Sequence, residues 1–136
     1  MSPEKTKILF ETFLDLFGPD DFKNDLHQSL MGFGFECGDG WFDLVYDCFI
    51  RISEANCETV IVQVKEKFGG LRVYCRTYCE AVKRIIEETE ARSLITCEEC
   101  GADGATKTDN SWMVTLCDSC LEKRKADRRN TFADPL

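Results

Sequence analysis

Apolar side chains recur at helical spacing from the start of the chain. Ser2 can cap the N-terminus of a helix, and Pro3 suits the first turn, where a backbone N–H has no helical partner. Gly18 and Pro19 end the pattern. The apolar stripe that predicts this helix consists of Ile8, Leu9, Thr12, Phe13, Leu16 and Phe17.

Two more helices are predicted in the N-terminal half of the chain. The first is capped by Asp20 or Asp21 and ends near Gly32. A loop follows at residues 33–40, where three glycines fall within eight positions. Asp39 can then cap another helix that buries one face. The apolar residues of that face are Trp41, Leu44, Val45, Cys48, Phe49 and Ile52.

Beyond Glu58 the apolar period changes to two, which is typical of strands. The alternating apolar residues are Val60, Val62, Val64, Leu71, Val73 and Cys75. Gly69 and Gly70 separate the two runs, so we predict a β-hairpin with a two-residue turn. In the expected register Lys67 lies opposite Arg72. The other expected pairs are Phe68 with Leu71, Lys65 with Tyr74, and Val64 with Cys75.

Helical spacing returns over residues 78–94, and a cysteine-rich segment and a charged tail complete the chain. The apolar side of this helix is formed by Tyr78, Val82, Ile85, Ile86 and Thr89. The pattern as a whole predicts an α+β fold with N-terminal helices, a β-hairpin, a further helix and a C-terminal zinc ribbon. We divide the chain into an α+β domain at residues 1–95, the ribbon at 96–121 and the charged tail at 122–136.

Two C-x2-C pairs, Cys97/Cys100 and Cys117/Cys120, carry the strongest chemical signal in the chain. Sixteen residues separate the pairs, and a loop of that length can fold back as a short hairpin and bring four sulfurs together. Four thiolates around Zn²⁺ leave no open coordination position, so we expect a structural zinc and not a catalytic one. Two thioredoxin-like redox pairs are the alternative, but each would have to open a helix after a strand.

Composition narrows the class of protein. Of the 136 residues, 43% are hydrophobic and 31% charged, so the chain can bury a core. Nine cysteines in a reducing compartment favour metal ligation over a disulfide framework. No apolar run approaches the roughly 20 residues that cross a bilayer, and the charges near the start do not fit a signal peptide. We therefore expect a cytoplasmic protein that does not contact a membrane.

The five remaining cysteines are Cys37, Cys48, Cys57, Cys75 and Cys79. Cys48 and Cys75 fall on predicted apolar faces and are interpreted as small buried side chains. Cys75 and Cys79, together with Cys37 or His27, form a weaker second metal candidate, because their spacing is not a standard one. His27 is the single histidine in the chain, so acid–base or triad catalysis that depends on histidine is not favoured.

The outward face of the predicted hairpin is basic, with Lys65, Lys67, Arg72, Tyr74 and Arg76. The expected opposition of Lys67 and Arg72 is unfavourable, and an anionic partner would relieve it. Three interpretations stay open: acidic residues of the same chain neutralise the face, solvent does so, or nucleic acid binds with its phosphates on the basic residues and Tyr74 stacking. The basic residues at 123–129 are either a solvated helix end or a binding arm.

Acidic residues concentrate in the first half of the chain. The net charge is −8, and residues 1–57 hold 11 acidic and 4 basic residues, whereas residues 58–95 hold 6 and 7. An acidic protein repels phosphate backbones, so a nucleic-acid contact needs a local basic patch. Asp43 and Asp47, outward on their predicted helix, are candidates for binding a basic patch on a partner protein. Solubility alone is the alternative role for these acids.

A metal-dependent nuclease is the enzyme class with some support. Gln63-Val64-Lys65 resembles the (D/E/Q)-x-K half of a nuclease motif, in which carboxylates hold Mg²⁺ and a lysine lies near the attacked phosphate. That motif needs a preceding strand with an aspartate, whereas residues 41–54 are predicted to be helical. We therefore expect a protein without enzymatic activity.

Three segments together resemble a group of small proteins encoded by bacteriophages, prophages and bacteria. They are GDGWFDLVYD at residues 38–47, QVKEKFGGLRVYCR at 63–76, and TCEECG with TLCDSC around the cysteine pairs. The similarity covers roughly residues 37–121, and Val73 stands where the group has Phe. The resemblance implies the origin and the fold, and it carries no activity. By analogy with small acidic phage proteins as a class, we expect a non-enzymatic zinc-binding protein-interaction module that inhibits a host defence or transcription factor. A nucleic-acid-binding accessory protein is the alternative function.

Overall fold

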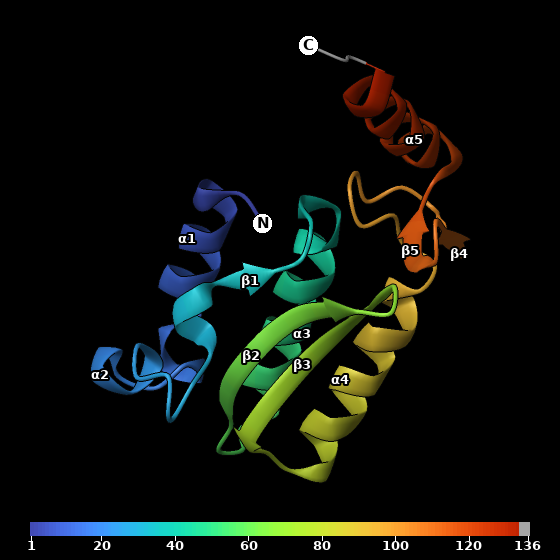
Figure 1. Cartoon of the computed structure of the whole chain (residues 1–136). Helices are drawn as coiled ribbons and strands as arrows, with labels where there is room; N and C mark the ends of the chain where they lie inside the picture. The colour runs from blue at the N-terminus through green and yellow to red at the C-terminus, as the bar shows by residue number, and fades with distance from the viewer. Residues whose placement is uncertain (134–136) are drawn as a thin grey trace.

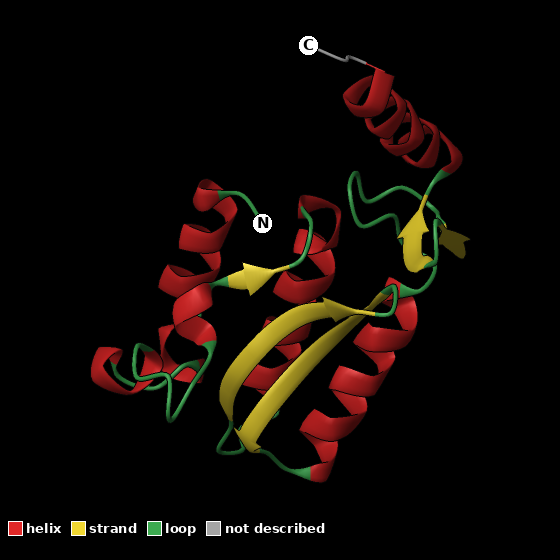
Figure 2. Cartoon of the chain, in the orientation of Figure 1, coloured by secondary structure: helices red, strands yellow, loops and turns green. Residues whose placement is uncertain are grey.

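The computed structural model describes residues 1–133, and the side chains as far as residue 130 (Figure 1). It confirms the α+β class, with a three-stranded sheet in the order β1-β2-β3 and a separate two-stranded sheet, β4-β5 (Figure 2). The elements are α1 (Pro3–Thr12), η1 (Leu14–Leu16), α2 (Asp20–Lys23), η2 (Met31–Phe33), β1 (Phe35–Glu36), η3 (Asp39–Trp41), α3 (Phe42–Glu54), β2 (Val60–Lys67), β3 (Gly70–Thr77), α4 (Glu80–Ser93), β4 (Ala105–Asp109), β5 (Trp112–Leu116) and α5 (Asp118–Ala133).

The N-terminal segment is less helical than its apolar spacing predicts. Ser2 caps α1 as expected, since its Oγ accepts a hydrogen bond from the Lys5 N–H at 3.3 Å. The helix nevertheless ends at Thr12, and the second predicted helix, expected to run to Gly32, is wrong beyond Lys23. Asp25 and Ser29 explain the early stop, because their side chains bond nearby backbone N–H groups and so compete with a helix.

The predicted loop at 33–40 contains the short strand β1, which was not expected. Phe35 and Glu36 pair in parallel with Val64 and Lys65 of β2. The Phe35 side chain is buried, and its ring centroid lies 5.0 Å from that of Phe10. A two-residue strand is too short to show a period in sequence, so only this long-range pairing defines it.

The hairpin forms, but its predicted register is wrong. The turn consists of Phe68 and Gly69, which both have positive φ (53° and 83°), as the common two-residue hairpin turn requires. Lys67 therefore pairs with Gly70, and Lys65, not Lys67, lies opposite Arg72. The other observed pairs include Glu66 with Leu71, Val64 with Val73, and Gln63 with Tyr74.

A β-bulge changes which residues of β2 face the core. The register shifts between Ile61 and Gln63, so Val62 has no partner on β3. Ile61 and Val64 are both fully buried, three positions apart, whereas strict alternation predicted Val60, Val62 and Val64 on one face. The Val62 carbonyl instead accepts a hydrogen bond from the Leu30 N–H at 2.7 Å.

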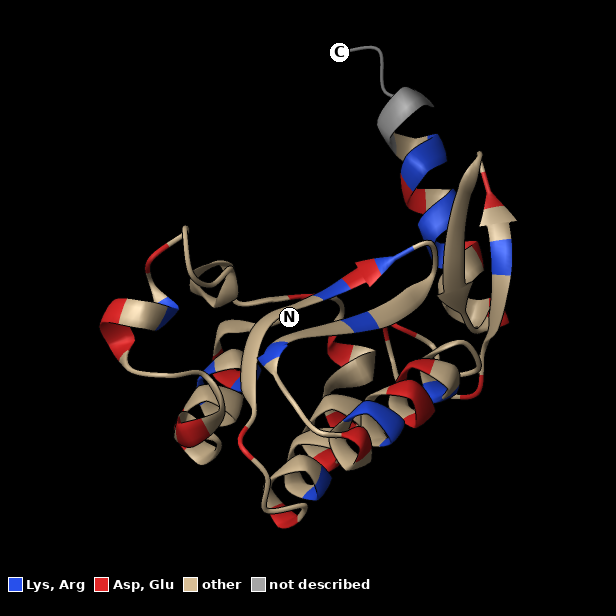
Figure 3. Cartoon of the chain, turned by 90° about the horizontal axis from the view of Figure 1, so that it is seen from below, with Lys and Arg blue, Asp and Glu red and all other residues tan. Residues whose placement is uncertain are grey.

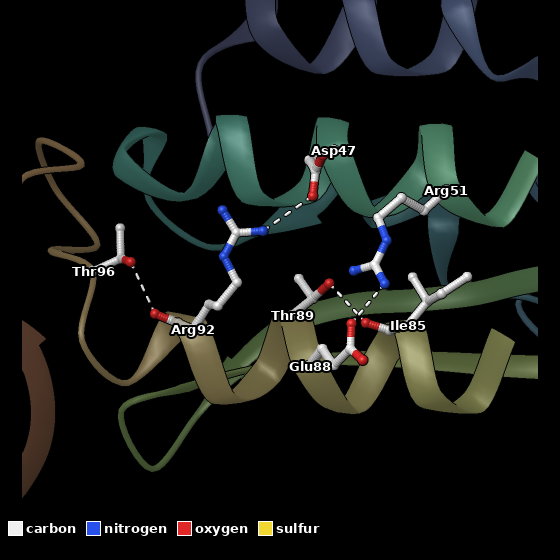
Figure 4. Close-up of polar contacts among 7 residues, drawn as sticks. All are labelled: Asp47, Arg51, Ile85, Glu88, Thr89, Arg92 and Thr96. Carbon is white, nitrogen blue, oxygen red and sulfur yellow. Dashed lines mark hydrogen bonds and ion pairs between the residues drawn. The ribbon is translucent and has the colours of Figure 1, made fainter. Parts of the chain in front are cut away.

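Helices α3 and α4 cover one face of the three-stranded sheet, and the other face carries no helix along β2 and β3 (Figures 1 and 3). Their apolar stripes are confirmed, except that Tyr78 lies outside α4 and is exposed. Arg51 and Arg92 join the two helices through ion pairs with Glu88 and Asp47, at 2.6 and 3.0 Å (Figure 4).

The free edge of β3 is covered by side chains of α4. Ser93 Oγ accepts the Leu71 N–H at 2.9 Å, and the Glu90 carboxylate accepts the Val73 N–H at 3.1 Å. These bonds satisfy backbone donors that would otherwise form an open pairing edge. The β3 edge is therefore covered, whereas one face of the sheet carries no helix along β2 and β3 (Figure 1).

Candidate metal centre

The four predicted ligands Cys97, Cys100, Cys117 and Cys120 meet at one point, and their sulfur atoms all lie within 4.8 Å of one another. The β4–β5 hairpin brings the two pairs together, and the second pair opens α5. The Sγ atoms of Cys100 and Cys117 are 3.8 Å apart. Tetrahedral zinc with Zn–S bonds of about 2.3 Å needs sulfurs about 3.8 Å apart, so the cluster fits a tetrahedral metal ion.

Backbone hydrogen bonds favour the thiolate form of Cys97. Burial opposes ionisation of the Cys97 thiol, but backbone hydrogen bonds at Cys117, Cys100 and Glu99 outweigh it and lower the pKa to about 7. The Cys120 N–H also points to the Cys117 sulfur at 3.4 Å. The first pair is closed by a hydrogen bond from the Gly101 N–H to the Cys97 carbonyl at 2.9 Å, with Gly101 at φ +82°. The four sulfur atoms are therefore already close enough together to bind a single metal ion.

The GDGW segment docks residues 96–121, which we call the cysteine module, onto the rest of the protein. The Gly40 N–H donates to the Glu98 carbonyl at 2.7 Å, and the Gly38 N–H donates to the Glu98 carboxylate at 2.9 Å. The Trp41 indole N–H donates to the Thr96 carbonyl at 2.8 Å, and its ring is fully buried. This segment therefore connects the metal centre to the core.

Asp39 has a different role from the predicted one. It does not cap α3, because η3 precedes that helix and Trp41 occupies the cap position without a side-chain bond. Its carboxylate instead accepts a hydrogen bond from the Ser2 N–H at 2.7 Å. Asp39 thus ties the start of α1 to the segment that docks the metal centre.

The tip of the β2–β3 hairpin makes a second contact with the cysteine module. The Thr115 hydroxyl donates to the Gly69 carbonyl at 2.5 Å, and Thr115 is fully buried. The Thr106 hydroxyl donates to the Leu94 carbonyl at the end of α4, at 3.1 Å. These two hydrogen bonds fix the position of the cysteine module relative to the β2–β3 hairpin and α4.

The basic tail is a helix, α5, which packs back on the cysteine module. Asp109, whose side chain is 2% exposed, accepts hydrogen bonds from Arg124 at 3.0 Å and from both terminal nitrogens of Arg128 at 2.8 and 2.9 Å. Two of the five tail cations are therefore neutralised within the chain, which favours a docked helix over a binding arm. Residues 134–136 of the predicted tail lie outside the described residues.

Replacing Asp109 with Asn is expected to loosen α5. The hydrogen bond from Arg128 lowers the pKa of Asp109 from 3.8 to about 2, so the native state favours the carboxylate. Its stabilising effect is present above about pH 4 and is lost as the pH falls from about 4 to 2. At pH 7 the variant should show faster amide hydrogen exchange in residues 121–130 and a lower Tm. Asp103→Asn, an exposed change in the same module, should show neither, and equal exchange in both variants would contradict this role.

The remaining cysteines correct two expectations. Cys57 and Cys79 form a disulfide across the open end of the hairpin, although the cysteine count favoured metal ligation alone. The second metal candidate is wrong, because the Cys79 sulfur is bonded to Cys57. Among the residues that the structure describes, the four-cysteine cluster is the only group that could hold a metal ion. Cys57 precedes β2 and Cys79 follows β3, so an antiparallel hairpin brings the two cysteines close together. Their positions at the two ends of the predicted hairpin are the signal in the sequence that could have indicated the disulfide. Burial raises the pKa of Cys75 to about 12, as for an inert thiol.

The seven predicted partner-binding residues separate into two surfaces. Lys65, Lys67, Arg72, Tyr74 and Arg76 project from the sheet face without a helix, which we call the open face. None of its four cations forms an ion pair in the described part of the chain. Glu36 of β1 lies next to Lys65. Asp43 and Asp47 belong to α3 on the other side of the sheet, where Asp47 is paired with Arg92.

A groove next to the open face was missed by the sequence analysis. It has a volume of about 780 Å³, lies between the tips of the two hairpins, and is lined by Lys65, Glu66, Lys67, Phe68, Ser111, Trp112 and Met113. Phe68 is 66% exposed and Trp112 71% exposed. Phe68 was expected to lie opposite Leu71 within the strand pair, and Trp112 begins β5. The corrected turn position places Phe68 at the groove.

The nuclease-like segment gains a neighbouring strand, but among the described residues no group of metal-ligating side chains gathers around it. Gln63 and Lys65 lie on β2 beside Glu36 of β1, and the Gln63 amide donates to the Glu36 carboxylate at 3.5 Å. Residues 42–54 are helical, as predicted. A single carboxylate is fewer than the ligand set on which this chemistry depends. The four-cysteine cluster therefore remains the chemical centre that the geometry supports.

Comparison with known proteins adds no relative. No family model, curated protein or solved structure matches this chain. Among residues 1–133, no helix is long and apolar enough to cross a membrane.

Proposed function

We propose that this protein is a non-enzymatic binding protein, in which a structural zinc ion holds the cysteine module in place and the open face takes an anionic partner. The observation that carries the proposal is the charge of that face. Four cations lie there without an ion pair to any residue whose side chain the structure describes, in a chain whose net charge is −8. Arg51, Arg92 and Arg124 each have a carboxylate partner, whereas Lys83 and Arg84, which also form no ion pair in the described part of the chain, belong to a helix rich in glutamate.

Zinc is the metal that four thiolates in a tetrahedral arrangement favour. With four protein ligands the ion has no position for water or substrate, so its contribution is to folding. Its removal would release Cys97 and Cys100 from Cys117 and Cys120, and with them the β4–β5 hairpin that borders the groove. The zinc therefore supports binding only through structure.

The open face carries repulsion that a partner would remove. Lys65 lies directly opposite Arg72, and like charges at such positions destabilise a strand pair. The Arg72 guanidinium folds over Gly70, where a Cβ would approach its NH1 atom to 2.7 Å. Glu36 offsets only part of the positive charge. An anionic group on this face would be attracted by three or four cations at once.

A second candidate function follows from the resemblance to phage-encoded proteins: binding to a basic surface of a host protein through Asp43 and Asp47. Asp43 is exposed on α3 and supports this function. We rank it second, because Asp47 already forms an ion pair with Arg92 at 3.0 Å. The host and the compartment, which we expect to be its cytoplasm, belong to the same proposal.

Lys65→Glu is the variant that tests the anionic partner. It replaces the repulsive Lys65–Arg72 pair with an attractive one but turns the attraction between Lys65 and Glu36 into a repulsion. The two effects, each about 0.2–1 kcal/mol, oppose each other, so the Tm should change little. Retention on immobilised heparin, a polyanion probe, should fall, and the variant should elute at lower salt. Arg84→Glu makes the same charge change on α4 and should elute with the unmodified protein. If Lys65→Glu and Arg84→Glu elute together, the open face is not the anion-binding surface.

A further inference from the structure

The groove between the hairpin tips combines exposed aromatic rings with lysines. Phe68 and Trp112 are 66% and 71% exposed, and Met113 is 46% exposed. Lys65 and Lys67 line the same groove, and the Lys67 ammonium lies 5.6 Å from the centre of the Phe68 ring. The other tryptophan, Trp41, is fully buried. Large aromatic side chains are thus presented to solvent beside unpaired positive charge.

Phe68 lies on one short hairpin turn, and Trp112 directly follows another at the start of β5. Phe68 and Gly69 form the β2–β3 turn, and Asn110 and Ser111, with φ of 51° and 72°, form the β4–β5 turn. The hydrogen bond from Thr115 to the Gly69 carbonyl joins one turn to the other hairpin. The metal centre closes the base of β4–β5. The backbone that carries the two rings is therefore already ordered, so less conformational entropy is lost when a ligand binds.

We propose that this groove binds single-stranded nucleic acid, with bases stacked on Trp112 and Phe68 and phosphates on Lys65 and Lys67. This inference rests on the anion-binding function proposed for the open face. The alternation of ring and cation continues over that face through Arg72, Tyr74 and Arg76. A single strand alternates base and phosphate in the same way, and every base offers a face for stacking.

A duplex fits the groove less well, because its base faces are stacked on one another and cannot reach exposed rings. An acidic peptide would match the lysines but has no regular series of flat rings. Single-stranded nucleic acid is therefore the occupant that accounts for both the charge and the aromatic exposure. The negative charge of the whole chain limits the contact to this basic surface.

The test measures fluorescence anisotropy of a labelled 20-nucleotide oligo-dT on the zinc-loaded protein. Trp112→Ala and Phe68→Ala should each weaken binding about tenfold, within the range known for base–aromatic stacking. Trp112→Phe should restore much of the affinity. Ile95→Ala removes a side chain that is 64% exposed outside the groove and should bind like the unmodified protein. Oligo-dT should also quench tryptophan emission, because Trp112 is the exposed tryptophan.

The outcomes separate this inference from the anion-binding function. Trp112→Ala and Phe68→Ala should leave heparin retention unchanged, since neither alters charge. The inference is overturned if both variants bind oligo-dT like the unmodified protein. It is also overturned if a 20-base-pair duplex or a poly-glutamate peptide binds as tightly as oligo-dT. In either case, reduced heparin retention of Lys65→Glu would still support anion binding by the open face. If Lys65→Glu changes neither heparin retention nor oligo-dT binding, both proposals fail.

Discussion

Cys117→Ser is expected to abolish metal binding and to unfold the cysteine module. The unmodified protein should carry one zinc per chain, because the four sulfurs lie within 4.8 Å of one another and form one complete ligand set. Structural zinc contributes about 10–16 kcal/mol to folding of small zinc-binding peptides. The buried core of the module consists of Cys97, Leu116 and Leu121, too few residues to replace that contribution. Elemental analysis measures the loss of metal, and hydrogen exchange over residues 96–130 measures the unfolding.

Cys75→Ser provides the matched control, since it removes a thiol from β3 outside the cluster. It should keep one zinc per chain, even though burying a hydroxyl in place of a thiol lowers stability. Because metal binding needs thiolates, the unmodified protein should also release zinc as the pH falls. A Cys117→Ser protein that retains one zinc, or an unmodified protein purified without any metal, would contradict the assignment.

Gly40→Ala is expected to separate the cysteine module from the sheet. A Cβ at this position would lie 2.2 Å from the Cys97 carbonyl oxygen and 2.6 Å from the Glu98 carbonyl carbon, and both are backbone atoms. Neither can move without displacing the first metal-binding turn or breaking the hydrogen bond from the Gly40 N–H to the Glu98 carbonyl. Overpacking commonly lowers the free energy of unfolding by about 1–3 kcal/mol. Because the clash here is with backbone atoms, we expect a loss of about 3 kcal/mol or more. Urea unfolding of the zinc-loaded protein measures the loss.

Gly32→Ala makes the same chemical change where space is available. Its Cβ would meet its nearest atoms at 3.6 Å, and φ there is not in the left-handed region. This control should alter the free energy of unfolding by well under about 1 kcal/mol. Equal stability of the Gly40 and Gly32 variants would show that the docking of the metal centre tolerates a shift and that the GDGW segment has another role.

Features that depend on neighbouring residues were predictable from the sequence. The zinc-type ligand set follows from two C-x2-C pairs, and the buried faces of α3 and α4 follow from helical spacing. The existence of the β2–β3 hairpin follows from two alternating runs around a turn. In each case the period or spacing contains the information, because contacts between residues three or four apart, or across a two-residue turn, decide the structure.

The remaining features depend on contacts between distant segments. The turn lies at Phe68-Gly69 and not at Gly69-Gly70, and the bulge at Val62 shifts the core-facing positions. Strand β1 exists through its pairing with β2, and Asp39 bonds to Ser2 instead of starting a helix. The observed turn gives Phe68, which is not a glycine, a positive φ that local energy disfavours. Hydrogen bonds made by the turn favour it instead, because the Gly69 carbonyl accepts the Thr115 hydroxyl and the Gly69 N–H donates to the Glu66 carboxylate.

The groove is the clearest case of a feature that only the tertiary structure determined. Its residues come from β2, from the β2–β3 turn and from the β4–β5 hairpin, about 45 positions apart in the chain. Sequence analysis identified the lysines of the open face, because alternation along one strand predicts their common side. It did not place Trp112 beside them, because that position depends on the contacts of the GDGW segment, the Thr115 hydrogen bond and the meeting of the four cysteines. Local periodicity determined which side chains point outward, whereas packing between distant segments determined which of them meet.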